Sequence, residues 1–291
     1  MSEFIMLLLG GLKFGAIYSL AAVGLIALHK ATKVVNFAHG GLVMLGAFGA
    51  YLWIVELGYP YWLAYLIVPL IIGVFAATLE FTLLRPLRRA DLFATITATI
   101  FLGIVLSEAY RMAYNVEILA VPVFWKGSPF FLGDVIVTRD QFWVSAGALI
   151  AGGISIAFFR YAPAGRSMRA MASNVRGAQL CGYSMDQMTG LAWFFAGVLA
   201  GLAGVFAAPS KGVSPELAVS IISAAFVAAV VGGFDSLLGA ILGGLILGIT
   251  ETFAAAYVSS SAKGAVSFLL LFVVLLWRPE GLFPERAGRN V

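Results

Sequence analysis

The sequence has few of the residues from which soluble proteins build their surfaces and reactive sites. Charged residues occupy 11% of its 291 positions and apolar residues 62%, whereas soluble domains carry roughly a quarter charged residues. It has one cysteine, Cys181, and two histidines, His29 and His39. An internal disulfide is therefore excluded, and a metal site is not expected. This composition predicts an all-α, polytopic membrane protein.

Motifs that bind phosphate or form catalytic centres are missing as well. The sequence contains no GxxxxGK[ST] loop, no HExxH and no GxSxG nucleophile elbow. It also lacks a regular series of intramembrane arginines or carboxylates, which voltage sensors and proton relays use. We therefore expect no catalytic residue, no metal and no cofactor in this chain, and we expect a partner to supply any energy for transport.

Nine apolar runs are candidates to cross a bilayer. The first, 4–28, follows Ser2 and Glu3 without a preceding cation, so we interpret it as a membrane segment rather than a cleaved signal. Gly232, Gly233 and Asp235 interrupt the interval 219–257, which leaves a pair of crossings or a broken helix open. We expect about eight to nine transmembrane helices in a single transmembrane domain over 1–291. The runs are 4–28, 36–55, 63–84, 92–110, 142–160, 190–209, 219–233, 237–257 and 264–277.

Lysine and arginine in the short loops predict the orientation. If the N-terminus faces outward, the inner loops hold twelve of these cations and the outer loops hold five. The N-terminus is therefore expected outside and the C-terminus in the cytoplasm, which requires nine crossings. The inner set is Lys30, Lys33, Arg85, Arg88, Arg89, Arg160, Arg166, Arg169, Arg176, Arg278, Arg286 and Arg289, and the outer set is Arg111, Lys126, Arg139, Lys211 and Lys263.

Two polar segments interrupt the apolar pattern. The segment 160–188 is compatible with an amphipathic helix that either rests on anionic headgroups or docks a soluble partner from the cytoplasm. The segment 111–141 has prolines and glycines between short β-rich runs and predicts an extracytoplasmic hairpin or cap. At helical spacing in 160–188, the apolar stripe is Met168, Met171, Ala172, Val175 and Ala178, and the polar stripe is Arg166, Arg169, Ser173 and Arg176.

Two charged residues fall well inside apolar runs. Lys13 lies about 14 Å into the first segment by helical rise, near the middle of a ~30 Å hydrocarbon core. Glu251 lies at a comparable depth from the outer face. We predict that the two either pair or face a shared aqueous path, with snorkelling of Lys13 as the alternative. Glu80 and Glu108 lie nearer segment ends and are expected to be solvated.

The second apolar run opens with polar residues and continues with glycines. Asn36 and His39 either help receive a carboxylate at the start of a helix or only cap that helix. Glycines at spacings of three and four predict close helix packing. The glycine sets are Gly40, Gly41, Gly46 and Gly49; Gly197, Gly201 and Gly204; and Gly239, Gly243, Gly244 and Gly248.

Along nearly its whole length, the sequence resembles the LivH-type permeases of bacterial branched-chain amino acid ABC importers. The resemblance rests on four stretches in this order. They are Asn36-Phe37-Ala38-His39-Gly40 after GAIYSLAAVGL; Gly165, Arg169, Ala170, Ala172, Asn174, Ala178 and Gly182; 228–233 followed by 239–244; and 278–283.

The resemblance implies a multi-pass permease subunit of the bacterial inner membrane. Its implied partners are two cytoplasmic ATP-binding subunits that hold ATP and Mg²⁺, a second LivM-like permease and a periplasmic substrate-binding protein; no nucleic acid is expected. We place Lys13, Asn36, His39, Gly40 and Glu251 in the translocation path. By the same resemblance the coupling helix that contacts an ATPase contains Gly165, Arg166, Arg169, Asn174, Ala178 and Gly182.

Departures from the family leave the solute open. Lys13 stands where a small or hydroxylated residue is usual, and a fixed cation would suit an acidic solute. The expected solute is a branched-chain amino acid or a related amino acid, amide or carboxylate.

Either a heterodimer or a homodimer of permeases is possible. The alternative function is a standalone secondary transporter or channel for a small anion. Ser184 and Gln187 are expected to form a capping box at the sixth segment.

Overall fold

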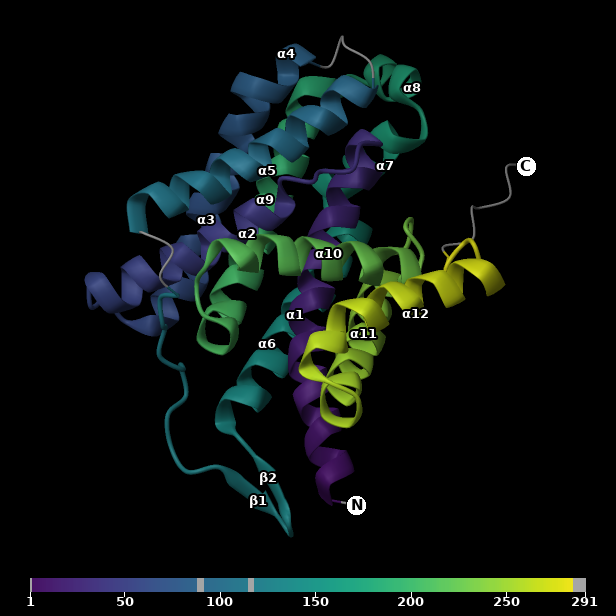
Figure 1. Ribbon diagram of the computed structural model, residues 1–291. Coiled ribbons are helices and arrows are strands. Elements are labelled where there is room, and N and C mark those ends of the chain that lie inside the picture. The colour runs from purple at the N-terminus through teal and green to yellow at the C-terminus, as the bar shows by residue number, and fades with distance from the viewer. Residues whose placement is uncertain (1, 88–91, 115–117, 285–291) are drawn as a thin grey trace. The chain divides into compact units, whose positions relative to one another are not determined.

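The computed structural model describes residues 2–87, 92–114 and 118–284, and most of these residues are helical (Figure 1). Four of the cations used to predict the orientation, Arg88, Arg89, Arg286 and Arg289, lie outside the described residues. The helices are α1 (Ser2–Thr32), α2 (His39–Tyr51), η1 (Leu52–Glu56), α3 (Tyr61–Leu79), η2 (Glu80–Leu84), α4 (Arg85–Leu87), α5 (Leu92–Tyr114), α6 (Arg139–Tyr161), α7 (Pro163–Ser173), α8 (Val175–Leu180), α9 (Met185–Lys211), α10 (Pro215–Gly232), α11 (Leu237–Tyr257), η3 (Ser260–Ala262) and α12 (Lys263–Trp277); the strands are β1 (Phe130–Leu132) and β2 (Val135–Val137).

Nine helical segments in the described chain are long and apolar enough to cross a membrane. Each overlaps one of the nine apolar runs, so the all-α polytopic fold is confirmed. Several helices extend past the apolar run by a few residues, because a helix continues into the polar interface where hydropathy has already fallen. In the uncertain interval, α10 and α11 are two separate continuous helices joined by a turn at Gly233, whose φ is +111°. A broken helix over 219–233 is therefore wrong.

The chain divides into two compact units. Unit 1 comprises 1–26, 127–152 and 224–291, and unit 2 comprises 27–126 and 153–223. Three helices, α1, α6 and α10, contribute residues to both units. The single domain expected over 1–291 thus contains two compact units.

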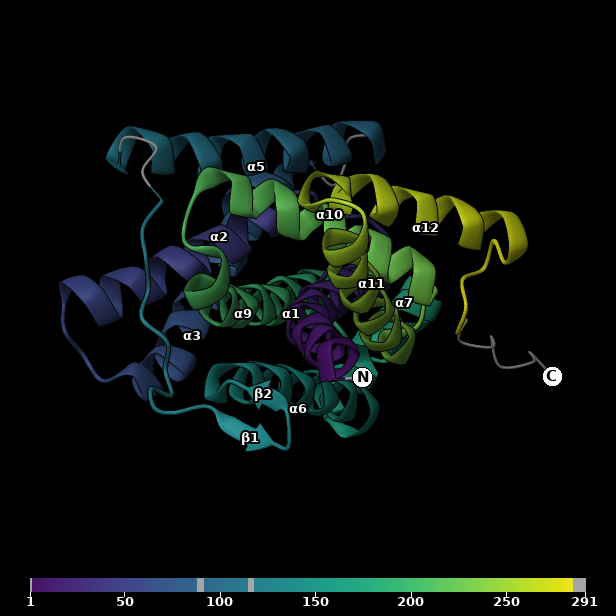
Figure 2. The same cartoon turned by 60° about the horizontal axis from the view of Figure 1, so that its bottom comes forward.

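In unit 2 the helix α9 packs against both α2 and α3 (Figure 2). Glycines permit this approach, because a Cβ on Gly46 of α2 would lie 2.6 Å from the Cα of Gly201 on α9. A Cβ on Gly201 would in turn lie 2.9 Å from the Cα of Pro69 on α3. Contact at this distance brings backbone against backbone, so the predicted close packing of the glycine faces is confirmed here.

In unit 1 the helix α11 packs against α12 and against the first part of α1. A Cβ on Gly11 of α1 would lie 2.7 Å from the Cα of Ile249 on α11. The Ser19 hydroxyl donates a hydrogen bond to the Gly15 carbonyl oxygen and contacts the Ile241 carbonyl oxygen, both at 2.7 Å. The contact with Ile241 joins α1 to α11 in a region where an unbonded polar group would be costly.

The segment 111–141 contains the predicted hairpin. β1 and β2 pair antiparallel with Phe130 opposite Val137, and Gly133 takes a φ of +62° in the turn. The ends of the segment differ from the expectation, because 111–114 complete α5 and 139–141 begin α6.

The polar segment 160–188 forms two helices rather than the one predicted. Asn174 adopts an extended conformation between α7 and α8, and its Oδ1 accepts a hydrogen bond from the Gly177 N–H at 2.9 Å. A side-chain cap of this kind starts a new helix and so changes the helical phase. Met168, Met171 and Ala178 are buried as the stripe predicts, whereas Val175, the first residue after the break, is exposed.

The predicted capping box at the sixth segment is wrong. Ser184 does occupy the N-cap position of α9, but its side chain makes no capping hydrogen bond to the described residues.

Candidate functional site

Lys13 on α1 forms an ion pair with Asp140 in the first turn of α6, both within unit 1. The two side chains are only 13% and 9% exposed. Direct pairing of Lys13 with Glu251, one of the two predicted arrangements, is therefore wrong. Sequence reasoning missed Asp140 because it lies at the edge of an apolar run, where a carboxylate is ordinarily solvated.

Glu251 on α11 has its own partners in unit 1. The Tyr18 hydroxyl donates to its Oε2 at 2.8 Å, and the Ser267 hydroxyl of α12 donates to its Oε1. Both carboxylate oxygens are thus hydrogen-bonded, which lowers the cost of a charge inside an apolar helix bundle. The other predicted arrangement, a shared aqueous path for Lys13 and Glu251, stays a prediction.

The segment Asn36–Gly41 contributes to two cavities in unit 2. The apolar pocket, of about 750 Å³, lies between the start of α2, helix α5 and the start of α10, and Phe37, Gly40 and Gly41 line it. The polar pocket, of about 230 Å³, has Asn36 in its wall. Asn36 and Phe37 are consecutive in the sequence, so this short segment belongs to both cavities.

Gly40 and His39 are fully enclosed at the start of α2. A Cβ on Gly40 would lie 2.8 Å from the Cβ of Ile222, so a larger residue would push α10 away from α2. His39 has no exposed surface. Both positions therefore determine how closely α2 and its neighbours pack in unit 2.

One end of the apolar pocket is charged. Arg111 lies 3.4 Å from a Glu108 carboxylate oxygen and 3.3 Å from a Glu216 carboxylate oxygen. All three side chains are at least 40% exposed. Glu108 is accordingly solvated, as predicted, and the rest of this pocket is mainly apolar.

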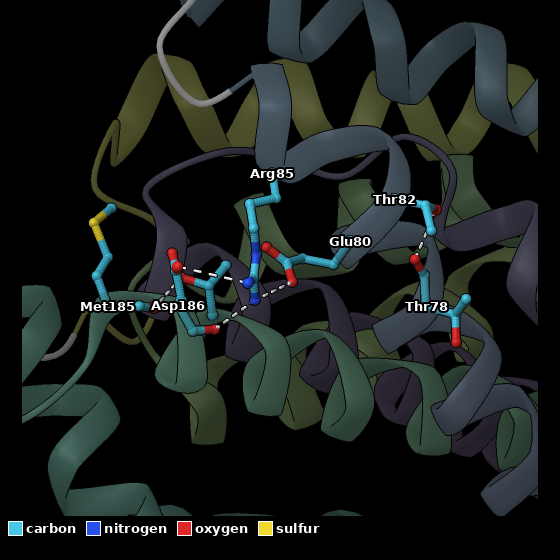
Figure 3. A network of polar contacts seen from close by, with 7 residues as sticks. Thr78, Glu80, Thr82, Arg85, Met185 and Asp186 are labelled. Carbon is cyan, nitrogen blue, oxygen red and sulfur yellow. Dashed lines mark hydrogen bonds and ion pairs between the residues drawn. The ribbon is translucent and has the colours of Figure 1, made fainter.

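Glu80 differs from that prediction. It is 1% exposed, and its Oε2 lies 3.5 Å from an Arg85 nitrogen. Arg85 also lies 3.5 Å from the Asp186 carboxylate and contacts the Asp186 carbonyl oxygen at 3.5 Å, which links the end of α3 and η2 to the first turn of α9 (Figure 3). Helical structure continues past the apolar run to Leu87. Glu80 therefore lies inside the bundle, which hydropathy alone could not reveal.

The residues expected to contact an ATPase fall into two groups. Arg166 and Asn174 are exposed on the α7–α8 segment, as is Gly182, which adopts a φ of +87°. Gly165 and Ala178 are buried, and a Cβ on Gly165 would lie 2.7 Å from the Cα of Phe159. Arg169 is partly buried and donates to the Arg160 carbonyl oxygen at 3.3 Å. The buried members support the segment, whereas the exposed members are accessible to a partner.

Comparison with protein families and curated proteins gives a consistent result. Residues 7–275 match the family described as the permease component of branched-chain amino acid transport systems. The LivH permease proteins of high-affinity branched-chain amino acid transport in Escherichia coli and Salmonella typhimurium are each 30% identical over 96% of this chain and 95% of their own. The corresponding BraD protein of Pseudomonas aeruginosa is 29% identical over 94% of each chain.

A solved structure supports the fold. PsaBC from Streptococcus pneumoniae, in complex with a Fab, superposes with a TM-score of 0.53 over 96% of each chain. The sequence identity is 14%, so this likeness concerns the fold alone.

Proposed function

Because the chain belongs to the family of permease components of branched-chain amino acid transport systems, we propose that it is the membrane subunit of an ATP-driven importer. The family and the nine apolar helices place it in the bacterial inner membrane as a multi-pass protein. The match over 7–275 is the observation that carries the proposal. The chain has no phosphate-binding motif of its own, which is consistent with ATP hydrolysis in partner subunits.

The proposed solute is a branched-chain amino acid or a related zwitterion. The argument for an anionic solute depended on Lys13 as a fixed cation, and Asp140 neutralises that charge. At the apolar pocket, Arg111 lies between two carboxylates, so this group of side chains carries no net positive charge. A path without a net fixed cation favours a zwitterion over an anion.

We further propose that the exposed residues of α7 and α8 dock on one of two ATP-binding subunits, which hold ATP and Mg²⁺. A second LivM-like permease and a periplasmic substrate-binding protein complete the assembly, and the β1–β2 hairpin is the proposed contact for the binding protein. The predicted orientation, with the N-terminus outside, puts these surfaces on the required sides of the membrane.

Transport in this proposal is alternating access, with Asn36, His39 and Gly40 at the centre of the path. The participation of Asn36–Gly41 in both cavities of unit 2 supports this assignment. Lys13 and Glu251 are assigned to holding α1, α6, α11 and α12 together through their buried partners. Rocking of packed helices then opens one side at a time.

The proposal is tested by reconstituting the chain in vesicles with candidate ATPase, permease and binding-protein partners. L-Leucine uptake and ATP hydrolysis are measured together. Uptake is expected only with ATP and all partners. Uptake of leucine or of a small anion by the chain alone would instead establish a secondary transporter or channel.

A charge reversal tests the coupling surface. Arg166→Glu on the exposed face of α7 should reduce leucine-stimulated ATP hydrolysis and uptake at least about tenfold, a loss of roughly 1.4 kcal/mol in coupling. Lys263→Glu, also exposed but outside the α7–α8 segment and the β1–β2 hairpin, is the control and should change neither rate. Normal ATPase binding and uptake in Arg166→Glu would remove α7 from the coupling surface.

A further inference from the structure

The charged end of the apolar pocket in unit 2 offers groups of both signs to a ligand. The carboxylates of Glu108 and Glu216 both lie close to the guanidinium of Arg111 there. All three side chains line the pocket, and Glu108 and Glu216 are 58% and 65% exposed. A molecule in the pocket can therefore reach an acidic and a basic group at the same end.

The contacts within this group leave capacity for a ligand. Arg111 Nη2 donates to Glu216 Oε1 at 3.3 Å, whereas Arg111 Nε, 3.4 Å from Glu108 Oε1, makes no hydrogen bond to the described residues. Both distances exceed the roughly 2.7–2.9 Å of a strong charge-assisted hydrogen bond. A guanidinium carries several N–H donors, and a carboxylate oxygen can accept more than one hydrogen bond. Glu108 can thus accept from an ammonium group while Arg111 donates to Glu216 and to a second carboxylate.

The pocket wall beside the charged end is aliphatic. Ile104 lies four residues before Glu108 on α5, and Val219 lies three residues after Glu216 on α10. At these spacings each helix presents an acidic and a branched apolar side chain on one face. Ile104 and Val219 line the pocket and are exposed. One helical turn rises ~5.4 Å, so the side chain of a bound amino acid can reach this wall from the charged end.

Contacts beside the pocket hold the end of α5 against the start of α10. The Tyr110 hydroxyl, next to Arg111 in the sequence, donates to the Val213 carbonyl oxygen at 3.0 Å. Val213 also pairs with Leu119 through two backbone hydrogen bonds of 2.9 and 3.0 Å. The two helix ends are therefore held together before any ligand binds, which lowers the entropy cost of binding.

The pocket is large enough for an amino acid. Its volume of about 750 Å³ is within the ~300–1,000 Å³ of pockets that bind small molecules. Gly40, Gly41 and Gly103 contribute to this space, because they line the pocket without side chains. An α-amino acid with an aliphatic side chain fits, with space left for water molecules.

We propose that this pocket binds an aliphatic α-amino acid at its charged end. The ammonium group contacts Glu108, the carboxylate accepts from Arg111, and the side chain packs on Ile104 and Val219. Both charged groups of an α-amino acid are attached to one carbon, so they match an acidic and a basic side chain that lie side by side. The inference rests on the proposed function, which it deepens by assigning the contacts of the solute. In the predicted orientation, this end of the pocket faces outward, where solute enters.

A cysteine-protection assay tests the site in the full chain with its partner subunits in nanodiscs. Ser107 lines the pocket between Ile104 and Glu108. Ser107→Cys in a Cys181→Ser background places the only thiol of this chain there, and L-leucine should slow its reaction with a maleimide at least about threefold. The native Cys181, exposed and outside the pocket lining, is the control thiol and should react at a rate that leucine does not change.

Two substitutions separate the contacts through their opposite effects on two leucine analogues. Arg111→Gln removes the partner of the carboxylate, so protection should need about ten times more L-leucine. Protection by 3-methylbutylamine, which lacks the carboxylate, should be at least as strong as before. Glu108→Gln removes the partner of the ammonium group, so protection by L-leucine and by 3-methylbutylamine should weaken about tenfold. Protection by 4-methylpentanoate, which lacks the ammonium group, should not weaken. Glu3→Gln, at an exposed position outside unit 2, is the matched control and should leave all protection unchanged.

A variant that keeps its protection by one ligand is folded, so these opposite effects distinguish recognition from loss of structure. Equal weakening for every ligand in both variants would overturn the assigned contacts. Absence of leucine protection in a complex whose vesicles take up leucine would overturn the site and leave the proposed function intact. Protection by added phospholipid but not by leucine would assign the pocket to a lipid chain instead. Protection by leucine without any leucine uptake would support the site and contradict ATP-driven leucine import.

Discussion

Unit 1 and unit 2 both enclose carboxylates, but they surround them differently. In unit 1, Asp140 lies against Lys13, and each oxygen of Glu251 accepts a hydroxyl from Tyr18 or Ser267. In unit 2, Glu80 shares Arg85 with Asp186 beside a cavity, and the buried Nδ2 of Asn36 has no partner in the described chain. The first arrangement is self-contained, and the second has room for another molecule.

This difference separates two reasons for burying a polar group in a membrane protein. A charge that is neutralised by protein partners holds helices together and need not meet the solute. A buried donor without an acceptor, such as Asn36 Nδ2 in the described chain, costs stability instead. Substitutions in unit 1 should therefore change stability more than solute selectivity, and substitutions in unit 2 should do the reverse.

The largest expected effect is the loss of the Lys13–Asp140 pair. Lys13→Met leaves Asp140 buried without a counter-charge and should lower the free energy of unfolding by about 3 kcal/mol. Denaturant unfolding in detergent measures this change. Lys13→Met combined with Asp140→Leu should recover most of the loss and transport leucine normally. If the double variant is stable but does not transport leucine, the pair belongs to the solute path. That result would contradict the purely stabilising role assigned to the polar groups of unit 1.

Arg85→Met should have a smaller effect on stability. It removes the ion pair between Arg85 and the buried Glu80, but Arg85 is 31% exposed, so we expect a loss of about 2 kcal/mol. Glu80→Gln in addition should restore stability. Chemical denaturation in detergent measures both changes. A double variant as unstable as Arg85→Met alone would show that Arg85 stabilises the bundle through contacts other than the one with Glu80.

Glu251→Gln should cost about 1 kcal/mol, because hydrogen bonds to a charged acceptor are replaced by bonds to a neutral one. Thermal unfolding in detergent reports the loss, with leucine uptake expected at the unaltered rate. The same change made in a Tyr18→Phe background should cost less, since the hydroxyl that donates to Glu251 Oε2 is already absent. An unchanged cost would show that Tyr18 does not stabilise the carboxylate.

The smallest expected effect is that of Asp186→Asn. Its side chain is 54% exposed, so the ion pair with Arg85 should contribute at most about 0.5 kcal/mol to stability. Thermal unfolding in detergent measures this change. A loss of more than about 1 kcal/mol would show that Asp186 contributes more than an exposed ion pair does.

Most of the fold could be predicted from hydropathy. A helix that crosses a membrane needs a long apolar run, because its side chains face lipid. The nine apolar runs in the sequence therefore predicted the nine helices of sufficient length and hydropathy in the described chain. The hairpin in 111–141 followed from turn residues between short β-rich runs, and the family followed from four motifs in order. These features depend on residues that are neighbours in the sequence, so the order of residues alone predicts them.

The polar contacts depended on tertiary structure. Lys13 and Asp140 are 127 positions apart, and no local pattern could pair them in preference to Lys13 and Glu251. Glu80 was expected in solvent because it lies near the end of its run, yet the continuing helix and α9 enclose it. Asn174 starts α8 through a side-chain cap, which the amphipathic pattern did not reveal. Hydropathy reports where a helix lies in the membrane, but it does not determine which neighbour each face meets.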